Sequence, residues 1–319
     1  MKKTEINKDS KIYVAGHNGM VGSALVRLLK KKGYTNIIVR SRAELDLRDT
    51  QPVREFLGTE QPDFIFIAAA RVGGILANNN FRAEFLHDNL MIESNLINGA
   101  HLANVQRLMF LGSSCIYPRE CPQPIKEEYL LTGPLEYTNE PYAIAKIAGV
   151  KLCESYNAQY GRQYFSGMPT NTYGPQDNYH PENSHVLPAL ILKAHNSRIN
   201  DEPTMTVWGT GTPKREFIFV DDLADACIHL MERGYDGPIV NIGSGLDVTI
   251  RTLAETVADV VGYKGELVFD SSKPDGTPRK LMDVGRLASL GWTAKTELRE
   301  GIKLAYESSP FFNSNDIEI

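Results

Sequence analysis

A serine, a thiol, a tyrosine and a lysine occupy positions that together could move protons and reduce a carbonyl group. Ser113 and Cys115 stand two residues apart at the end of a strand-like run, and Tyr142 precedes Lys146 by four residues. Residues four apart on a helix share a face, so Lys146 can lie beside Tyr142 and lower the pKa of its phenol into the range useful for proton donation. The Ser113 hydroxyl can orient a substrate carbonyl. These residue types are typical of a nicotinamide-dependent carbonyl reductase, and Cys115 adds a candidate acid or base that acts on carbon.

A glycine-rich turn near the amino end predicts a dinucleotide-binding site. Residues 11–15 have the apolar pattern of a buried strand, and residues 23–32 have the pattern of a helix. Between them the glycines follow a G-x-x-G-x-x-G spacing, which lets the backbone approach a pyrophosphate at the amino end of the helix. The candidate cofactor contacts in this turn are Gly16, His17, Asn18, Gly19, Met20, Val21 and Gly22.

The end of the second predicted strand indicates which nicotinamide cofactor is bound. Residues 36–39 form this strand, and Arg40 and Arg42 follow it with no acidic residue before Glu44. An acid at this point usually binds the ribose hydroxyls of NAD, whereas an arginine accommodates the 2′-phosphate of NADP. The sequence therefore predicts NADP(H), with Asp46 and Leu47 as candidates to flank the adenine.

Eight short stretches carry a resemblance to a known enzyme family. They cover residues 16–24, 69–75, 111–118, 139–146, 168–171, 183–186, 208–213 and 273–280. With them the chain resembles the extended short-chain dehydrogenase/reductases over nearly all of residues 11–305. Within that family it is most similar to the epimerase/reductases that act on GDP-4-keto-6-deoxy-D-mannose. The Ser-Ser-Cys sequence at 113–115 and the Asn-Ser-His-Val sequence at 183–186 distinguish this group from its relatives.

The resemblance implies a reaction and a role for each residue of the site. These enzymes invert carbons 3 and 5 of the keto sugar and then reduce carbon 4 with NADPH. Both inverted carbons flank the ketone, so removing a proton from either gives an enolate, which Ser113 and Tyr142 would hold. By resemblance, Cys115 is the base and His185 is the acid that returns a proton to the opposite face. Tyr142 and Lys146 then serve the reduction.

The same resemblance implies further contacts with cofactor and substrate. The implied cofactor contacts outside the glycine-rich turn are Leu111, Gly112, Ser113, Ser114, Lys146, Pro169, Thr170, Asn171, Thr172 and His185. The implied substrate contacts, with the tryptophan stacked on guanine and the cations near the phosphates, are Lys193, Trp208, Arg215, Asp275 and Lys280. Family members commonly carry arginine in place of Asn18, so Arg40 and Arg42 are expected to hold the 2′-phosphate. A homodimer is also implied.

Alternating strand and helix patterns predict an α/β fold, with a Rossmann-like doubly wound parallel sheet and a smaller C-terminal substrate-binding domain. Strand patterns occur near residues 12, 37, 65, 108 and 164, and helical patterns cover 81–104 and 142–160. We expect a disordered leader over 1–10, an NADP-binding domain over 11–175 and a mainly substrate-binding domain over 176–319. Segments near 217–243 are expected to return to the first domain, because 217–222 and 239–243 have strand patterns followed by helices.

Composition excludes several other classes of protein. The formal net charge is −5, which disfavours non-specific nucleic-acid binding. No stretch approaches the roughly 20 apolar residues of a membrane span. The 4 cysteines show no metal-site spacing and no disulfide pattern, so we expect no metal and a reducing, cytoplasmic location.

Two alternatives stay open on the sequence. One is another nucleotide-sugar enzyme of the same fold. It could be an NAD-retaining 4-epimerase, which needs neither Cys115 nor His185, or a 4,6-dehydratase, which carries an Asp-Glu pair where this chain has Cys115 and Ile116. The other alternative is a non-catalytic NADP-binding sensor, although such proteins tend to lose the tyrosine or lysine that this chain retains. Fold alone does not decide between these functions, so the site residues carry the choice.

Overall fold

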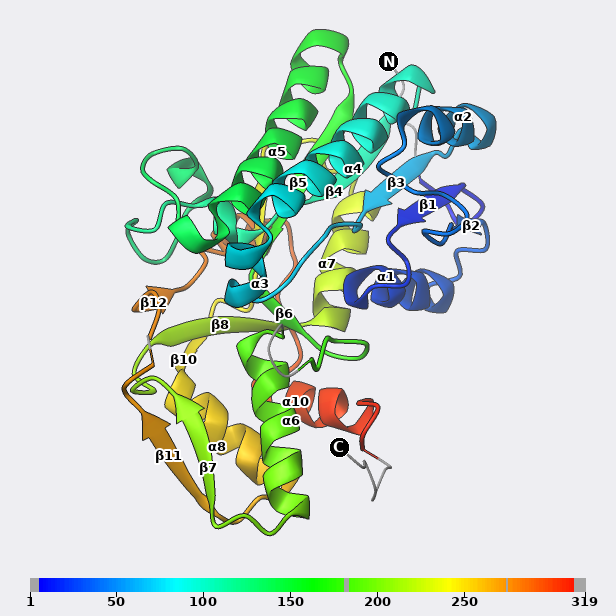
Figure 1. Ribbon diagram of the computed structural model, residues 1–319. Coiled ribbons are helices and arrows are strands. Elements are labelled where there is room, and N and C mark those ends of the chain that lie inside the picture. The colour runs from blue at the N-terminus through cyan, green and yellow to red at the C-terminus, as the bar shows by residue number, and fades with distance from the viewer. Residues whose placement is uncertain (1–5, 181–183, 274, 313–319) are drawn as a thin grey trace.

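Six parallel strands form the central sheet of the computed structural model, which describes residues 6–180, 184–273 and 275–312 (Figure 1). Their order across the sheet is β2-β1-β3-β4-β5-β9. The strands span Ile12–Ala15 (β1), Ile37–Ile38 (β2), Phe64–Ile67 (β3), Arg107–Leu111 (β4), Gln163–Pro169 (β5) and Val240–Ile242 (β9). Every residue of β1, β3 and β4 is buried, as expected of a parallel sheet that is covered on both faces.

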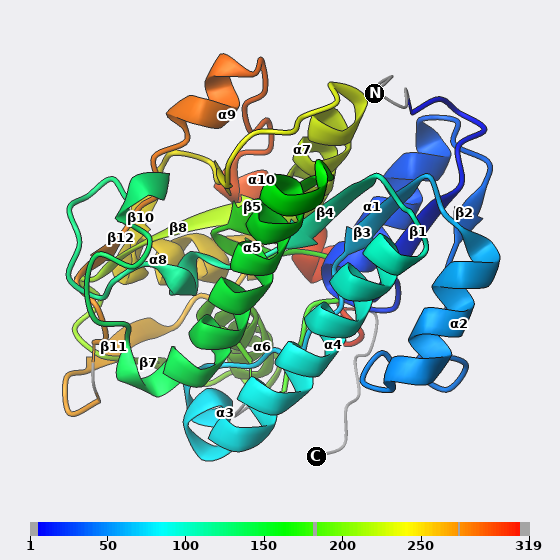
Figure 2. The ribbon, with the colours of Figure 1, turned by 90° about the horizontal axis from the view of Figure 1, so that it is seen from above.

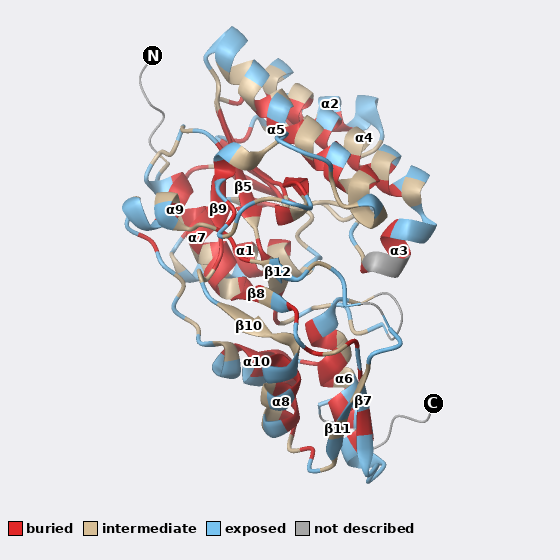
Figure 3. Cartoon of the chain, turned by 90° about the vertical axis from the view of Figure 1, so that its left-hand side faces the viewer, coloured by how far each residue is buried: buried red, intermediate tan, exposed pale blue. Residues whose placement is uncertain are grey.

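Helices cover both faces of this sheet, because alternate side chains of each strand point to opposite faces. The helices span Met20–Lys31 (α1), Thr50–Glu60 (α2), Arg82–Leu102 (α4), Glu140–Tyr160 (α5) and Val220–Glu232 (α7). Ile12 and Phe64 pack on the side of α1 and α7, whereas Tyr13 and Ile65 pack on the side of α2, α4 and α5 (Figure 2). The buried residues gather between helices and sheet (Figure 3). The predicted Rossmann-like doubly wound sheet is confirmed.

A smaller part of the chain, below the central sheet in Figure 1, combines two short sheets with three helices. In one sheet β8 pairs with β6, β10 and β12, and in the other β7 pairs with β11. The strands span Asn171–Tyr173 (β6), Thr204–Trp208 (β7), Lys214–Phe219 (β8), Asp247–Thr249 (β10), Glu266–Asp270 (β11) and Arg279–Lys280 (β12). The helices span Val186–Ile199 (α6), Ile250–Val261 (α8) and Leu298–Glu307 (α10). Leu190, Val257 and Ile302 belong to the separate core of this part.

Short helices interrupt the loops of the chain, and those that directly follow β3 and β4 lie at the carboxyl edge of the central sheet. They span Ile75–Asn80 (α3), Gly285–Ser289 (α9), Ser114–Ile116 (η1), Glu127–Tyr129 (η2) and Tyr137–Asn139 (η3). α3 follows β3, η1 follows β4, and η3 leads directly into α5. Ligands of open parallel sheets bind outside the carboxyl ends of the strands, so these loops surround the expected site.

The two longest helices cover one face of the central sheet and are buried only on the side that faces it (Figure 2). α4 and α5 have 21 residues each, but they carry charged residues such as Glu93 and Lys146. Within the described ranges, no helix is both long enough and apolar enough to cross a membrane.

A single boundary near residue 175 does not describe the two parts, because later segments of the chain return to the larger part. β9 joins the central sheet beside β5, and α7 packs against α1. β8 pairs within the smaller part instead, and residues 220–222 begin α7 rather than completing a strand over 217–222. Asp221 and Asp222 lie in the first turn of α7, where negative side chains stabilise a helix. The division into two domains therefore stays a proposal.

Residues 6–10 differ from the disordered leader that the sequence suggested. Asn7 and Ser10 close a turn, with the Ser10 backbone N–H donating to the Asn7 carbonyl at 3.2 Å. Lys8 pairs with Glu232 of α7 at 3.2 Å, and Ile6 packs against the core around α1. This short polar segment is held because its groups find partners on the first domain. Residues 1–5 lie outside the described residues.

Candidate active site

Close backbone packing fixes the glycine-rich turn between β1 and α1. A Cβ atom on Gly22 would lie 2.1 Å from the carbonyl oxygen of Gly16, and one on Gly16 would lie 2.7 Å from the backbone of Ala69. Gly16 also has a φ of +87°, which favours glycine. Gly19 precedes α1, whose first turn contains no acidic residue and whose amino end has no side-chain cap. The turn therefore leaves backbone N–H groups facing a space that suits a pyrophosphate.

A histidine within this turn also indicates a site for a polar ligand. The Nδ1 atom of His17 is buried and has no hydrogen-bond partner among the described residues. Buried polar atoms are normally paired, so this nitrogen fits a site that a polar ligand completes. Asn18 belongs to the same turn, while Met20 and Val21 form the first residues of α1. These observations fit the dinucleotide cofactor that the sequence predicts.

The two arginines after β2 have carboxylate partners. Arg40 Nη2 lies 2.9 Å from Glu60 Oε1, whereas Arg42 Nε lies 3.5 Å from Asp46 Oδ2. The Arg42 side chain is 74% exposed, so it can turn toward a 2′-phosphate without breaking a buried contact. Arg40 would first have to leave Glu60.

The predicted adenine contacts lie just beyond these arginines. Arg48 Nη2 pairs with Asp46 Oδ2 at 2.6 Å, and its hydrogen bonds hold the pKa of the Asp46 carboxyl well below its usual range. Leu47 is half-buried, and its carbonyl accepts a hydrogen bond from Asn95 of α4 at 3.0 Å. The segment is therefore rigidly attached to the helix layer beside the turn.

The segment after β4 packs closely on β5. The Gly112 backbone N–H donates to the Gly167 carbonyl at 3.0 Å, and a Cβ atom on Gly112 would lie 2.5 Å from Met168. Leu111 and Ser114 on either side are buried. The end of the Met168 side chain fills the space beside Gly112, so a larger residue there would displace that side chain.

The segment after β5 is tied to β8 in the smaller part. Thr170 Oγ1 and Asn171 Nδ2 both donate to the Glu216 carbonyl, at 3.3 and 2.8 Å. Thr172 Oγ1 donates to the Thr170 carbonyl at 3.1 Å, and Pro169 ends β5. The Thr170 backbone N–H also donates to the Ile242 carbonyl, so both the side chains and the backbone of this segment are fixed by neighbouring strands.

Ser113, Tyr142 and Lys146 meet at the carboxyl end of β4. Ser113 lies close enough to the Tyr142 phenol to lower its pKa. Lys146 Nζ donates to the Leu111 carbonyl at 3.1 Å and lies 5.8 Å from the centre of the Tyr142 ring and 4.6 Å from that of Phe110. Lys146 is only 2% exposed, so its ammonium group is held against the sheet.

Burial shifts the acidity of the tyrosine in the direction opposite to that expected from Lys146. Burial raises the pKa of Tyr142, and the neighbouring Cys115 and Glu93 raise it further, while the hydrogen bond with Ser113 lowers it. Burial has the opposite effect on Lys146 and lowers its pKa, because it disfavours the charged ammonium form. Tyr142 is therefore a neutral phenol here, which is the form that can give a proton to an alkoxide.

Cys115 lies between a hydrogen-bond donor and a cation. Asn139 Nδ2 donates to its Sγ atom at 3.3 Å, and Lys280 Nζ lies 3.8 Å from the same sulfur. The Cys115 backbone N–H donates to Ser113 Oγ at 3.1 Å, which fixes the start of η1. An ammonium group and an amide donor both stabilise a thiolate.

The sequence did not predict that Lys280 and Asn139 would lie beside the Cys115 sulfur. The sequence assigned Lys280 to substrate phosphates, whereas the structure puts its ammonium group against Cys115. Asn139 was not among the predicted site residues, although it lies in the stretch 139–146 that carried the resemblance. Its position three residues before Tyr142, at the start of the same helix, was the available signal.

His185 enters from the smaller part of the molecule, directly before α6. Its side chain does not cap the helix, and it is exposed. The surrounding protein atoms still lower the pKa of His185 by removing water from it. Asn183 of the Asn-Ser-His-Val stretch lies outside the described residues. Cys115 and His185 thus belong to different parts of the molecule.

Trp208 presents an aromatic face at the end of β7. The residue is 66% exposed. The ammonium groups of Lys193 and Lys273 lie 5.6 and 5.5 Å from its ring centre. An exposed indole flanked by two cations can stack on a base and attract phosphates. Lys273 was not a predicted contact, although it opens the stretch 273–280.

Asp275 and Arg215 lie close to this aromatic face. Asp275 accepts hydrogen bonds from the backbone N–H and the hydroxyl of Thr210, at 2.7 and 2.8 Å. Burial lowers the pKa of Arg215, and Asp275 opposes that shift. Arg215 of β8 also pairs in register with Lys280 of β12. The predicted substrate residues therefore lie on adjoining strands and loops, with Asp275 tying two of those loops together.

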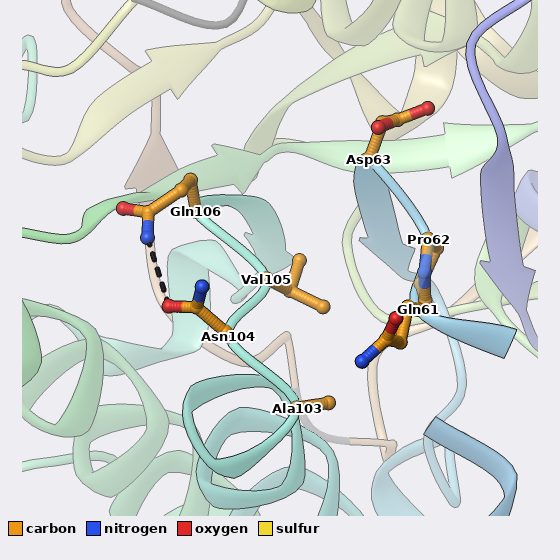
Figure 4. Close-up of a pocket in the computed structure, with 7 residues that line it drawn as sticks. All are labelled: Gln61, Pro62, Asp63, Ala103, Asn104, Val105 and Gln106. Atoms are coloured by element: carbon orange, nitrogen blue, oxygen red, sulfur yellow. Dashed lines mark hydrogen bonds between the residues drawn. The ribbon is translucent and has the colours of Figure 1, made fainter. Parts of the chain in front are cut away.

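A hollow at the opposite edge of the sheet is not part of this site. It has a volume of about 240 Å³ and is lined by Gln61, Pro62, Asp63, Ala103, Asn104, Val105 and Gln106 (Figure 4). These residues precede β3 and β4, whereas ligands of parallel sheets bind at the carboxyl ends. In the ranges that the structure describes, no group of three or more His, Cys, Asp and Glu residues could hold a metal ion.

Comparisons with known proteins agree with this arrangement. The family described as NAD dependent epimerase/dehydratase matches residues 12–243. GDP-L-fucose synthase 1 of Arabidopsis thaliana is 56% identical over 301 residues, covering 94% of this chain and 93% of that protein. A GDP-L-fucose synthase of Escherichia coli (strain K12) is 54% identical over 306 residues, covering 93% and 95%. A solved GDP-mannoheptose C4 reductase from Campylobacter jejuni with NADP bound is 40% identical with a TM-score of 0.86, covering 95% and 99%.

Proposed function

This chain belongs to the NAD dependent epimerase/dehydratase family, and we propose that it converts GDP-4-keto-6-deoxy-D-mannose into GDP-L-fucose with NADPH. The observation that carries this function is Cys115, held by Asn139 and Lys280 beside the Ser113–Tyr142 pair. Reduction alone requires no thiolate, whereas inversion of a carbon next to a ketone requires a base. The similarity to curated GDP-L-fucose synthases favours this function over an NAD-retaining 4-epimerase, a 4,6-dehydratase or a sensor.

NADP(H) is the cofactor that fits the turn after β1. The turn would hold the pyrophosphate with its backbone N–H groups, Arg42 and Arg40 would hold the 2′-phosphate, and Lys146 would donate to the ribose hydroxyls. When bound, NADPH supplies the hydride that reduces carbon 4 of the sugar. The similar C4 reductase was solved with NADP, which supports this choice of cofactor.

Each inversion begins when the Cys115 thiolate removes the proton from carbon 3 or carbon 5. The electron pair of the broken C–H bond moves into the ketone and gives an enolate, whose oxygen the Ser113 and Tyr142 hydroxyls hold. His185 then gives its proton to the same carbon from the opposite face. One inversion leaves a thiol and a neutral imidazole, so Cys115 must lose a proton and His185 must gain one before the next.

Tyr142 completes the reaction at carbon 4. Once that carbon is reduced, its oxygen is an alkoxide, which takes the phenol proton of Tyr142. The raised pKa of Tyr142 keeps the phenol protonated until this much stronger base forms. The nearby Lys146 ammonium group then stabilises the tyrosinate until a proton returns.

The nucleotide part of the substrate would bind along the smaller part of the molecule. Trp208 stacks on guanine, while Lys193, Lys273 and Arg215 face the diphosphate. The two lysines lie near the indole ring, and that proximity supports this assignment.

We also propose that the protein is a homodimer that pairs through α4 and α5. These helices pack side by side (Figure 2). Their apolar residues Leu102, Ile144 and Tyr160 are exposed. Light scattering should give the mass of a dimer for the native chain and a smaller mass for Tyr160→Glu. A native monomer would contradict the proposal.

A cytoplasmic location is proposed from the thiols. All four cysteines, Cys115, Cys121, Cys153 and Cys227, are unpaired. Free thiols, one of them proposed as a base, suit a reducing compartment.

The decisive experiment mixes the purified protein with NADPH and GDP-4-keto-6-deoxy-D-mannose, follows the nicotinamide absorbance and identifies the sugar. Stoichiometric oxidation with GDP-L-fucose as product is expected. An uninverted GDP-deoxy sugar would instead indicate a plain C4 reductase, like the similar heptose enzyme, and would remove Cys115 and His185 from the mechanism. No oxidation, together with NAD held tightly by the protein, would indicate a 4-epimerase.

A further inference from the structure

Glu93 is a buried carboxyl group that no step above uses. It lies on α4, is 1% exposed, and has no hydrogen-bond partner for either carboxyl oxygen among the described residues. A charged group without partners in a dry interior is unfavourable, so its presence calls for a compensating charge nearby.

The surroundings place this carboxyl group in the same enclosed space as Lys146. A Cβ atom on Gly149 would lie 3.1 Å from Glu93 Cδ and 2.5 Å from the Phe110 ring, so glycine leaves the room that the carboxyl group occupies. Gly149 follows Lys146 by three residues on α5, and such residues share a helix face. Lys146 Nζ in turn lies 4.6 Å from the centre of the same Phe110 ring. The carboxyl and ammonium groups therefore both border Phe110.

The charges of these two groups affect one another. Burial raises the pKa of Glu93 to about 8, and the positive charge of Lys146 opposes that rise. Burial lowers the pKa of Lys146, and Glu93 opposes that fall. Tyr142 and Cys153 of α5 also feel the charge of Glu93, but burial raises the pKa of both, so they are neutral near pH 7. The β4 groups that contact Lys146 are the Phe110 ring and the Leu111 carbonyl, and both are uncharged.

We propose that Glu93 is a positioning residue that keeps Lys146 protonated at the pH at which the enzyme works. When the carboxyl group is ionised, its negative charge favours the protonated form of Lys146. Without Glu93, the buried lysine would become neutral at a lower pH. A neutral Lys146 would bind the ribose hydroxyls less strongly and would no longer stabilise the tyrosinate of Tyr142. The link to sugar reduction rests on the proposed function.

Glu93→Gln tests this inference, because it removes the titrating group with little change of shape. The two quantities to measure across the pH range are kcat for NADPH oxidation with the keto sugar and the NADPH dissociation constant from fluorescence. Both kcat and NADPH affinity should fall above a certain pH, and we expect this pH to be about one unit lower in the variant than in the wild type. The variant should therefore have a kcat about tenfold lower than the wild type at the pH where wild-type activity begins to fall, and nearly the same kcat at acid pH. Superimposable pH profiles of the variant and the wild type would overturn the proposal.

Two further variants keep the result interpretable. Glu93→Met places an apolar side chain of similar length in the buried site, where such replacements of charged groups are often tolerated, and should give the same alkaline shift if Glu93→Gln does not fold. Glu84→Gln changes an exposed acid of the same helix and should leave both profiles unchanged. If the wild type binds NADPH but does not reduce the sugar, the proposed function fails. The role of Glu93 is then judged on the pH dependence of NADPH binding alone.

Discussion

The residues proposed for reduction and those proposed for inversion are held in two different ways. Ser113 follows β4, and Tyr142 and Lys146 belong to α5, which packs on β4 inside the larger part. Cys115 is half-buried, and His185 enters from the smaller part with an exposed side chain. Adding one proton to an oxygen requires one donor, whereas inverting a carbon requires groups on both faces of the sugar. The proposed inversion site would therefore need a residue from the other part of the molecule.

This difference predicts that the two activities can be separated by substitution. Changes in the buried group should act mainly on reduction, and changes at the junction of the two parts should act mainly on inversion. The variants below test that separation, from the largest expected effect to the smallest.

Tyr142→Phe should lower the rate of NADPH oxidation by about 10²- to 10⁴-fold, the usual contribution of a general acid. NADPH binding should stay within about threefold, because the phenol hydroxyl is not needed to hold the cofactor. Stopped-flow absorbance and fluorescence titration measure the two effects. Tyr137→Phe, at an exposed position, serves as the control. Unchanged turnover would remove Tyr142 from the role of acid.

Cys115→Ser should slow deuterium incorporation at carbons 3 and 5 by about 10²-fold or more, because a hydroxyl is a much weaker base than a thiolate. NADPH binding should not change. Mass spectrometry of the sugar in heavy water measures the exchange, and Cys121→Ser is the matched control for a half-buried thiol outside the mechanism. Exchange at the wild-type rate would show that Cys115 is not the base.

Lys280→Met should reduce the rate of exchange by about tenfold, since a charge-assisted contact to sulfur contributes on the order of 1–2 kcal/mol. Alkylation of Cys115 by iodoacetamide should slow in parallel, because the sulfur loses the ammonium group that lies 3.8 Å from it. Lys264→Met, at an exposed position in the loop after α8, should leave both rates unchanged. If alkylation of Cys115 is as fast as in the wild type, Lys280 does not stabilise the thiolate.

Trp208→Ala should raise KM for the GDP-sugar by about tenfold with kcat nearly constant, because stacking of a base on an aromatic ring is worth about 1–3 kcal/mol. Trp208→Phe should restore most of the affinity. Steady-state kinetics with varied sugar concentration measures both. An equal fall in kcat and kcat/KM would place Trp208 in the chemistry instead of in nucleotide binding.

The sequence predicted most of what depends on local pattern. The glycine-rich turn follows from the order of strand, glycines and helix, and its backbone contacts, such as that of Gly22 with Gly16, leave no room for other residues. The buried strands near residues 12, 65 and 108 were recognisable because parallel strands covered on both faces are continuously apolar. Spacing alone also placed Lys146 on the same helical face as Tyr142.

Other features depend on contacts between distant segments. The proximity of Lys280 to Cys115 joins residues 165 positions apart, and no local pattern encodes it. The same holds for β8, which pairs within the smaller part although its sequence resembles that of a central strand. The sequence suggested a lowered pKa for Tyr142, whereas burial of the phenol, together with the neighbouring Cys115 and Glu93, raises it.

By itself the sequence determined the fold class, the cofactor turn and the residue types available for catalysis, because each of these follows from periodicity, glycine spacing or neighbouring positions along one helix. Only the tertiary structure decided which groups share an environment. It placed Lys280 and Asn139 at the thiol, Glu93 beside Lys146, and Cys115 and His185 in different parts of the chain. The physical reason is that burial and charge act through space, so the acidity of a side chain depends on neighbours that the order of residues does not reveal.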